Sequence, residues 1–307
     1  MNVLVIGGSG LIGGETALYL AAQGHRVTLM SRTPPSSPAL TVLPHLCGDY
    51  VNDDMGDGRL EGFDWLVFSA AADIRNLPTD GSVTPEDFYR RHNDEAVPRC
   101  IAAARDAGVS KVVYIGSFYA QVAPQRIAEC PYVASRFNTD RAVRALTSDQ
   151  FAVITLDCPF ILGHIPGTRV PYIAALVDYA AGRLPDMPVF APRGGTNHMS
   201  SRSVAQAVLG AFQSGEPGRA YLVGDENLSW KAYLELWFRE AGNAREIEVS
   251  DEDHPLFPNA IMFAGAGATV AYDVSDDDLA QLGHYDRGQL LLTVRQVINA
   301  HDSGVQA

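Results

Sequence analysis

The chain has 307 residues, of which 47% are hydrophobic and 19% are charged, so it can bury a large core in one large domain or in two closely packed ones. Its formal net charge of -13 argues against nucleic acid or an anionic membrane as the main partner, because both attract a basic face. No apolar run approaches the ~20 residues that span a bilayer, and no basic region precedes the first apolar stretch as in a signal peptide. We therefore expect a cytoplasmic globular protein without a nucleic-acid or membrane partner.

The cysteines bear on redox state and on metal binding. The sequence has four, and they are scattered, at Cys47, Cys100, Cys130 and Cys158. No two of them form a Cys-x-x-Cys pair, so the pattern predicts neither a disulfide framework nor a metal site. Free thiols in a reducing compartment are expected.

The first predicted elements are a strand, a glycine-rich turn and a helix. Residues 3–6 are an apolar run typical of a buried parallel strand, and residues 11–23 predict a helix that ends at Gly24. Such a turn lets the backbone approach a pyrophosphate, which free amides at the helix N-terminus hold. The residues expected to bind a dinucleotide in this way belong to the run Gly7, Gly8, Ser9, Gly10, Leu11, Ile12 and Gly13. Two registers fit, namely Gly7/Gly10/Gly13 and Gly8/Gly10/Gly13.

Strands and helices alternate through the first half of the chain, which is typical of a doubly wound parallel sheet. A Pro/Ser-rich loop is expected over 33–38, and a helix over 86–107 with a kink at Pro98. Further strands are predicted over residues 26–30, 41–46, 65–69, 111–115 and 151–156.

The pattern changes after Pro159, where prolines divide the chain into short segments. Helices are predicted from Asp276 and over 172–183, 204–214 and 229–242, and a strand over 219–223. The expected fold class is α/β, a Rossmann-type doubly wound parallel sheet with a smaller C-terminal substrate-binding region. Its nucleotide-binding domain would cover 1–160, with segments near 190–225 returning to it, and the smaller region 161–307.

The end of the second strand bears on which dinucleotide binds. An NAD enzyme usually places Asp or Glu there for the ribose hydroxyls, whereas this chain has Ser31 and Arg32. A guanidinium suits a 2′-phosphate that a carboxylate would repel, so NADP(H) is favoured. The alternative is that Arg32 is a solvated loop residue. Asp49 either lies beside the adenine or serves as a turn residue.

A candidate catalytic group follows the fifth strand. Ser117 comes directly after that strand, and Tyr132 and Arg136 are spaced i and i+4, on one face of a helix. A phenol with a pKa near 10 is a poor acid or base at neutral pH, and a fixed positive charge nearby favours its phenolate. Ser117 is placed to polarise a carbonyl.

These features resemble the extended branch of the short-chain dehydrogenase/reductases, the NAD(P)-dependent epimerase/dehydratase group. That branch holds sugar-nucleotide epimerases, dihydroflavonol-type reductases and 3β-hydroxysteroid dehydrogenases. The resemblance covers nearly the whole chain. It includes the glycine turn, Asp49, Ser69, Ala70 and Ala71, Asn93, the segment that ends in Ser117, Tyr132 to Arg136, the segment from Asp157 through Pro159 to Gly163, and the stretches 218–224 and 272–285.

The resemblance implies a role for each matched position. Ser117 would orient the substrate oxygen, Tyr132 would exchange the proton, and Arg136 would bind the nicotinamide ribose. The family motif is Tyr-x-x-x-Lys, so Arg136 keeps the charge but not a proton-relay role. The alternative is a degenerate site in which Arg136 pairs only with Asp140. Relatives commonly dimerise through helices near 86–107 and 131–147, so the resemblance implies a homodimer.

The residues expected near the substrate favour a simple reductase over an epimerase. Sugar-nucleotide epimerases usually carry an Arg for the substrate diphosphate where this chain has Thr196, although Arg193 lies close by. We expect NADPH to reduce a ketone or aldehyde of a small or polyketide-like substrate, with the proton from Tyr132. Two alternatives are a nucleotide-sugar epimerase or dehydratase and a non-catalytic NADP-binding sensor. The expected pocket residues, each also compatible with core packing or a loop without a role, are Tyr119, Phe160, His164 and Met199.

Overall fold

A seven-stranded parallel sheet forms the centre of the computed structural model, which describes residues 1–168 and 170–304. Arg169 and residues 305–307, part of the expected C-terminal region, lie outside the described residues. The strand order is β10-β6-β5-β4-β1-β2-β3, which confirms the expected doubly wound sheet. The strands are β1 (Asn2–Ile6), β2 (Arg26–Ser31), β3 (His45–Cys47), β4 (Trp65–Phe68), β5 (Lys111–Ser117), β6 (Ala152–Cys158) and β10 (Ala220–Leu222).

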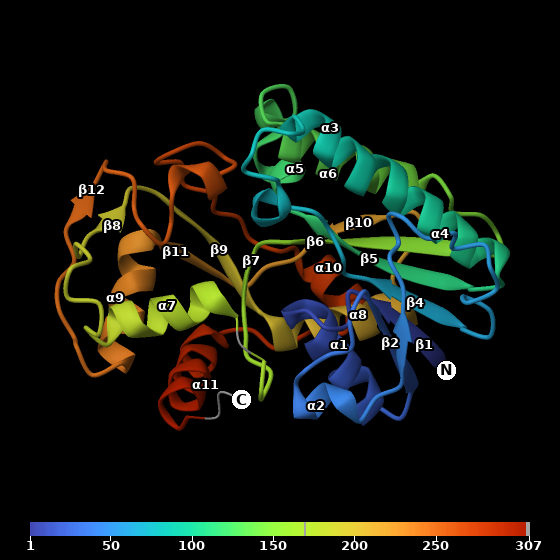
Figure 1. The fold of residues 1–307 in the computed structure, drawn as a ribbon, viewed down its shortest axis with the longest axis horizontal. Coiled ribbons are helices and arrows are strands. Elements are labelled where there is room, and N and C mark those ends of the chain that lie inside the picture. The colour runs from blue at the N-terminus through green and yellow to red at the C-terminus, as the bar shows by residue number, and fades with distance from the viewer. Residues whose placement is uncertain (169, 305–307) are drawn as a thin grey trace.

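Helices cover both faces of this sheet (Figure 1), and its central strands are accordingly mainly apolar. One face carries α1 (Leu11–Ala22), α8 (Ser201–Ser214) and the short α2 (Pro38–Thr41) and α10 (Asp276–Gln281). The other carries α3 (Pro85–Tyr89), α4 (Ala96–Asp106), α5 (Tyr119–Val122) and α6 (Pro131–Arg144). Within the part of the chain that the structure describes, no helix has the length and apolar character needed to cross a membrane.

The rest of the chain builds a second group of elements beside the sheet (Figure 1). It has its own core, centred on Tyr233, Trp237 and Phe238, which are fully buried. A three-stranded sheet of order β11-β9-β7 lies next to this core. The elements are β7 (Phe160–Leu162), α7 (Pro171–Ala180), β8 (Ala191–Pro192), β9 (Gly195–Ser200), β11 (Glu226–Ser229), α9 (Trp230–Glu240), β12 (Val249–Ser250) and α11 (Leu290–Asp302).

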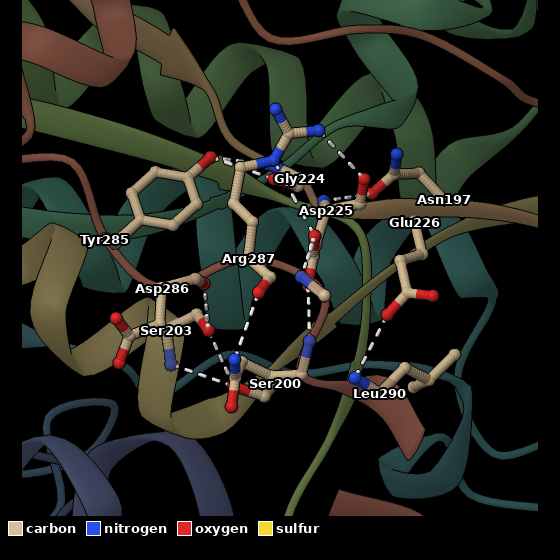
Figure 2. Close-up of polar contacts among 12 residues, drawn as sticks. Asn197, Ser200, Ser203, Gly224, Asp225, Glu226, Tyr285, Asp286, Arg287 and Leu290 are labelled. Atoms are coloured by element: carbon tan, nitrogen blue, oxygen red, sulfur yellow. Dashed lines mark hydrogen bonds and ion pairs between the residues drawn. The ribbon is translucent and has the colours of Figure 1, made fainter. Parts of the chain in front are cut away.

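The start of α11 is fastened to the connection between β10 and β11 (Figure 2). The buried carboxylate of Asp225 accepts the backbone N–H groups of Gly288 and Gln289 at 2.8 and 3.2 Å. Glu226 accepts the N–H of Leu290 at 3.0 Å. Because the first amides of a helix have no partner within it, Glu226 caps α11, and the Asp225 carboxylate just before the helix favours its dipole. The C-terminal segment is thereby held against the end of the main sheet.

Two predicted elements differ from the structure. The strand expected over 41–46 is wrong in its first half, because Pro38 begins the short helix α2 and β3 starts only at His45. The single helix expected over 86–107 is three pieces, α3, a π-helical turn over Arg90–Glu95 and α4. Pro98 lies shortly after the π-helical turn, within a helical run that continues from Pro85 to Asp106, so the loss of its N–H coincides with locally altered hydrogen bonding of the helix. The four cysteines are free, as expected.

Candidate active site

Close approaches require glycine at Gly7 and Gly8 in the turn between β1 and α1, and at Gly13 in the first turn of α1. Gly7 has φ +84, and its N–H donates to the Met30 carbonyl at 2.9 Å. A Cβ at Gly7 would lie 2.8 Å from the Ala70 nitrogen, and one at Gly13 would lie 2.4 Å from the Gly7 oxygen. The positive φ of Gly7 and the close approach of Gly13 favour the Gly7/Gly10/Gly13 register.

The N-terminus of α1 offers free amide donors at this turn. Gly10 is its N-cap in extended conformation, and no side chain among the described residues caps it. The first turn contains no acidic residue. Ser9, Leu11 and Ile12 are half-buried around these amides. An uncapped helix start behind a close-packed glycine turn fits the pyrophosphate of a dinucleotide.

The chain after β4 lines the other side of the turn. The Ser69 hydroxyl donates to the Ile6 carbonyl at 2.9 Å, which holds the end of β4 against β1. Ala70 and Ala71 follow, and the fully buried Asn93 pairs with both backbone groups of Ala72 at 2.9 and 3.0 Å. Asn93 therefore fixes the loop that follows β4.

The end of β2 carries the residues expected near the adenosine. The Ser31 hydroxyl donates to the Thr33 carbonyl at 2.8 Å and lies 2.9 Å from His45 Nε2. The guanidinium of Arg32 is exposed and makes no hydrogen bond or ion pair with the described residues. It is therefore available to a ligand.

Asp49 has the geometry of a turn residue. Its carboxylate accepts the backbone N–H of Val51 at 2.9 Å and the Asn52 amide at 2.8 Å. Both oxygens are therefore engaged within the turn itself. Of the two interpretations of Asp49, beside the adenine or as a turn residue, this geometry favours the turn residue.

Ser117, Tyr132 and Arg136 come from β5 and α6. Ser117 ends β5 and is 9% exposed, and Tyr132 is the second residue of α6 and half-buried. Arg136, one helical turn later, is 4% exposed. Its Nη2 donates to the Ile115 carbonyl at 2.6 Å, and its guanidinium carbon lies 5.2 Å from the Tyr114 ring centre.

The Arg136 guanidinium retains unused hydrogen-bond capacity. Its Nε and Nη1 are buried and have no partner among the described residues. The alternative in which Arg136 pairs with Asp140 is wrong, because Asp140 is bound by Arg144 at 2.6 Å. A buried cation with unpaired donors is unfavourable by itself, so Arg136 fits a polar group such as a ribose hydroxyl.

A cavity of about 460 Å³ lies beside this group, between α6 and the strands β6 and β10. Ser117, Arg136 and Asp157 contribute to its walls. Burial, and then the charge of Asp140, raise the pKa of Asp157 to about 7, while Gln121 donates to its Oδ2 at 2.6 Å. This carboxyl therefore changes charge near neutral pH. The sequence pointed to Asp157 only as the start of a family segment.

Aromatic side chains surround Tyr132, and two of them, Phe263 and Tyr89, were not expected. Phe263 stacks on the Tyr132 ring with centres 4.2 Å apart, and Tyr89 meets the same ring edge-on at 5.6 Å. Tyr119 contacts Phe263 edge-on at 5.6 Å, and burial raises the pKa of Tyr119. No sequence signal identifies Phe263, which lies in an irregular segment far from Tyr132 along the chain.

The other expected pocket residues lie elsewhere. Met199 is fully buried in the core next to the main sheet, so the expectation of a substrate contact there is wrong. His164 lines a small cavity of about 40 Å³ near α7 and α11, and burial lowers its pKa, so it is neutral at pH 7. Phe160 packs in an aromatic cluster with Trp230, and Pro159 is buried between β6 and β7.

Sugar-nucleotide epimerases usually carry an Arg for the substrate diphosphate at the position of Thr196. The described residues place no unpaired cation there. Thr196 is buried in β9. Arg193, the substitute suggested by the sequence, is exposed and pairs with Asp251 at 2.8 Å.

Comparison with known families decides the membership of the chain. A family model described as "NAD dependent epimerase/dehydratase family" matches residues 3–224. The chain belongs to this family. The family uses a nicotinamide cofactor, so the glycine turn and the uncapped start of α1 have a known class of ligand.

Curated relatives share part of their length with this member of the family. A 3-beta-hydroxysteroid dehydrogenase of Mycolicibacterium neoaurum is 30% identical over 160 residues, 50% of this chain and 42% of the relative. A 3 beta-hydroxysteroid dehydrogenase/Delta 5-->4-isomerase of Mycobacterium tuberculosis (strain ATCC 25618 / H37Rv) is 31% identical over the same shares. The chain thus spans about two fifths of the length of these relatives.

Solved structures share the fold over the whole chain. The crystal structure of gox2253 matches with a TM-score of 0.77 and 21% identity, covering 99% of both chains. The UDP-glucose 4-epimerase from Bifidobacterium longum, solved with NAD+ and UDP, matches with a TM-score of 0.76 and 16% identity, again covering 99% of both chains. At these identities the likeness shows the fold alone.

Proposed function

We propose that the protein is an NADPH-dependent oxidoreductase that reduces a ketone or aldehyde of a small organic substrate. The observation that carries the proposal is the Arg136 guanidinium, which is buried one helical turn from Tyr132 with Nε and Nη1 unpaired. It supplies a fixed positive charge near the phenol and spare donors for a cofactor ribose. A merely structural arginine would be expected to use these donors within the protein.

We propose a set of cofactor-binding residues around the glycine turn. The amides of residues 11–13 hold the pyrophosphate, Gly7 and Gly13 keep the backbone close to it, and Ser69 to Ala71 border the nicotinamide side together with Pro159. Arg32, exposed and free of partners among the described residues, binds the 2′-phosphate of NADPH. When bound, NADPH supplies the hydride that the carbonyl carbon accepts.

Residues on β5 and α6 bind the substrate oxygen and supply the proton. Ser117 donates a hydrogen bond to the substrate oxygen, and Tyr132 transfers its phenolic proton to the same oxygen. The tyrosinate left behind is stabilised by Arg136 until a solvent proton replaces the one transferred. Arginine is not deprotonated in proteins, so Arg136 contributes charge and hydrogen bonds and relays no proton.

The substrate lies between the two groups of elements. We propose that 1–160 with β10 and α8 forms the NADP-binding domain and that the elements from β7 onward supply most of the substrate side, with Tyr119 from α5. The likeness to hydroxysteroid dehydrogenases over half of the chain supports carbonyl or alcohol chemistry. The engagement of Arg193 by Asp251 speaks against a nucleotide-sugar diphosphate at that position.

A titration and a turnover assay test the proposal together. NADPH and NADH are titrated into the wild type and Arg32→Ala, and a panel of ketones and aldehydes is then assayed for net NADPH oxidation. We expect tighter NADPH binding that weakens about tenfold in the variant, as for the loss of a charged hydrogen bond, with NADH unchanged. Tightly co-purified NAD without net turnover would favour the epimerase. NADPH binding without turnover of any carbonyl would favour the sensor.

A further inference from the structure

An irregular segment of the C-terminal region crosses to the helix that carries Tyr132. It runs from the end of β12 to Thr269, which bridges to Gly195, and its only helical turn in the described structure is a 3-10 turn over Asn259–Ile261. Figure 1 shows this segment in orange and red, reaching from the C-terminal elements toward α5. Phe263 is thereby brought to a helix that lies far from it in sequence.

The Tyr132 ring is held on two sides. Phe263 lies against its face, with ring centres 4.2 Å apart and an interplanar angle of 22°. Tyr89, at the end of α3, meets it at 5.6 Å and 70°. Stacked and edge-on contacts have preferred geometries, so together they define the plane of the phenol.

A hydrogen bond ties Phe263 to the start of α6. Arg126 lies in the 3-10 turn Pro124–Ile127 just before α6, and its Nε donates to the Phe263 carbonyl at 2.9 Å. The same guanidinium pairs with Glu129 at 2.6 Å. Because the acceptor is a backbone oxygen, the tether does not depend on the side chain at position 263. Ring and tether can therefore be removed separately.

We propose that Phe263 is a positioning residue for Tyr132, which sets the plane of the phenol and excludes water from its face. The proposal rests on the proposed role of Tyr132 as the proton donor. A proton donor must stay within hydrogen-bond reach of the substrate oxygen, so freedom of the ring reduces the fraction of productive complexes. Phe263 itself transfers no proton and acts only through Tyr132.

The ring contact is tested first without any substrate. Tyrosine ring carbons are labelled with ¹³C in the full-length protein, and the Tyr132 resonance is identified by its absence in Tyr132→Phe. We expect Phe263→Leu to shift this resonance, because the ring current is lost while an apolar side chain remains. Phe263→Tyr should leave it close to its position in the wild type. An unchanged resonance in Phe263→Leu would contradict the stacking itself.

Kinetics then separate positioning from binding. On any carbonyl that the wild type reduces, we expect Phe263→Leu to lower kcat about tenfold with KM changed by less than about threefold, and Phe263→Tyr to restore kcat. Arg126→Gln, which keeps the ring but weakens the tether, should give a smaller loss, within about threefold. Phe63→Leu, in a half-buried phenylalanine packed against the core cluster that contains Leu60 and Leu66, is the matched control and should be neutral in both readouts.

Two results would overturn the proposal. One is a kcat in Phe263→Leu equal to that of the wild type, and the other is an effect confined to KM, which would make Phe263 a substrate contact. Failure of the proposed function looks different. In that case Tyr132→Phe would reduce carbonyls as fast as the wild type, while the resonance shift in Phe263→Leu would persist.

Discussion

The nucleotide-binding turn and the reaction side of the site are built in opposite ways. The backbone of the turn is mainly local, because residues 7–13 form it and it contacts the ends of β2 and β4. The reaction side combines β5, α6 and a segment from the C-terminal region, which meet at Tyr132. Substitutions elsewhere in the chain should therefore leave the turn intact. The surroundings of Tyr132, in contrast, can be changed by substitutions in several distant segments.

The largest expected effect is on the reaction side. Tyr132→Phe removes the phenolic proton and keeps the ring that contacts Phe263, so the fold should be unchanged. General acid catalysis typically contributes 10²- to 10⁴-fold, and we expect kcat to fall at least about 100-fold. Steady-state reduction of a carbonyl measures it, with unchanged NADPH affinity as the control. A variant as fast as the wild type would exclude Tyr132 as the proton donor.

A single added methyl group should disrupt the nucleotide-binding turn. Gly13→Ala places a Cβ 2.4 Å from the Gly7 oxygen, so α1 must move away from the turn. We expect NADPH affinity to fall at least about tenfold and the free energy of unfolding to drop by ~1–3 kcal/mol, as in other overpacked sites. Calorimetric titration and thermal unfolding measure the two changes.

Gly24→Ala is the matched control for the turn. Gly24 also has a positive φ, of +85, but a Cβ there meets nothing within 4 Å. Its substitution should therefore lower stability by ~1 kcal/mol through backbone strain and leave NADPH binding intact. Equal losses of affinity in both variants would mean that the close approach of Gly13 does not shape the site.

Two substitutions of Arg136 distinguish the effect of its charge from that of a proton-relay role. Arg136→Met removes the charge, and we expect kcat to fall about tenfold or more with a smaller change in KM. Arg136→Lys restores the family residue and keeps the charge, so kcat should stay within about threefold of the wild type. A large gain in rate for Arg136→Lys would show that arginine limits proton transfer in this protein.

A separate expected effect concerns the dependence of stability on pH. Burial raises the pKa of Asp157 to about 7, so the folded protein binds this proton more tightly than the unfolded chain, in which an aspartate titrates near 4. The carboxyl therefore destabilises the fold increasingly as the pH rises from about 4 to about 7, reaching on the order of 4 kcal/mol.

Thermal unfolding of Asp157→Asn checks this sign. The variant should gain in Tm over the wild type as the pH is raised from 5 to 8, because its amide does not ionise. Asp149→Asn, in an exposed aspartate, is the control and should show no such gain. A gain that shrinks with rising pH would contradict the burial argument.

The difference between the two regions also explains what the sequence could predict. The turn and α1 follow from residues 3–24 alone, and the helix ends at Ala22 with Gly24 at positive φ, as the glycine indicated. The direction of Arg136 depends on the Ile115 carbonyl and the Tyr114 ring of β5, which no helical spacing specifies. Phe263 reaches Tyr132 through an irregular segment, and such contacts leave no periodic pattern in a sequence.

The most direct test follows the hydride. The wild type is supplied with NADPH deuterated at C4 on the transferred face and with a carbonyl substrate, and the product is analysed by mass spectrometry. Our account predicts one deuterium on the carbinol carbon for each NADPH consumed, and a rate at least about 100-fold lower in Tyr132→Phe. Retention of the label on the cofactor, with no net NADPH consumption while a nucleotide sugar is interconverted, would contradict it.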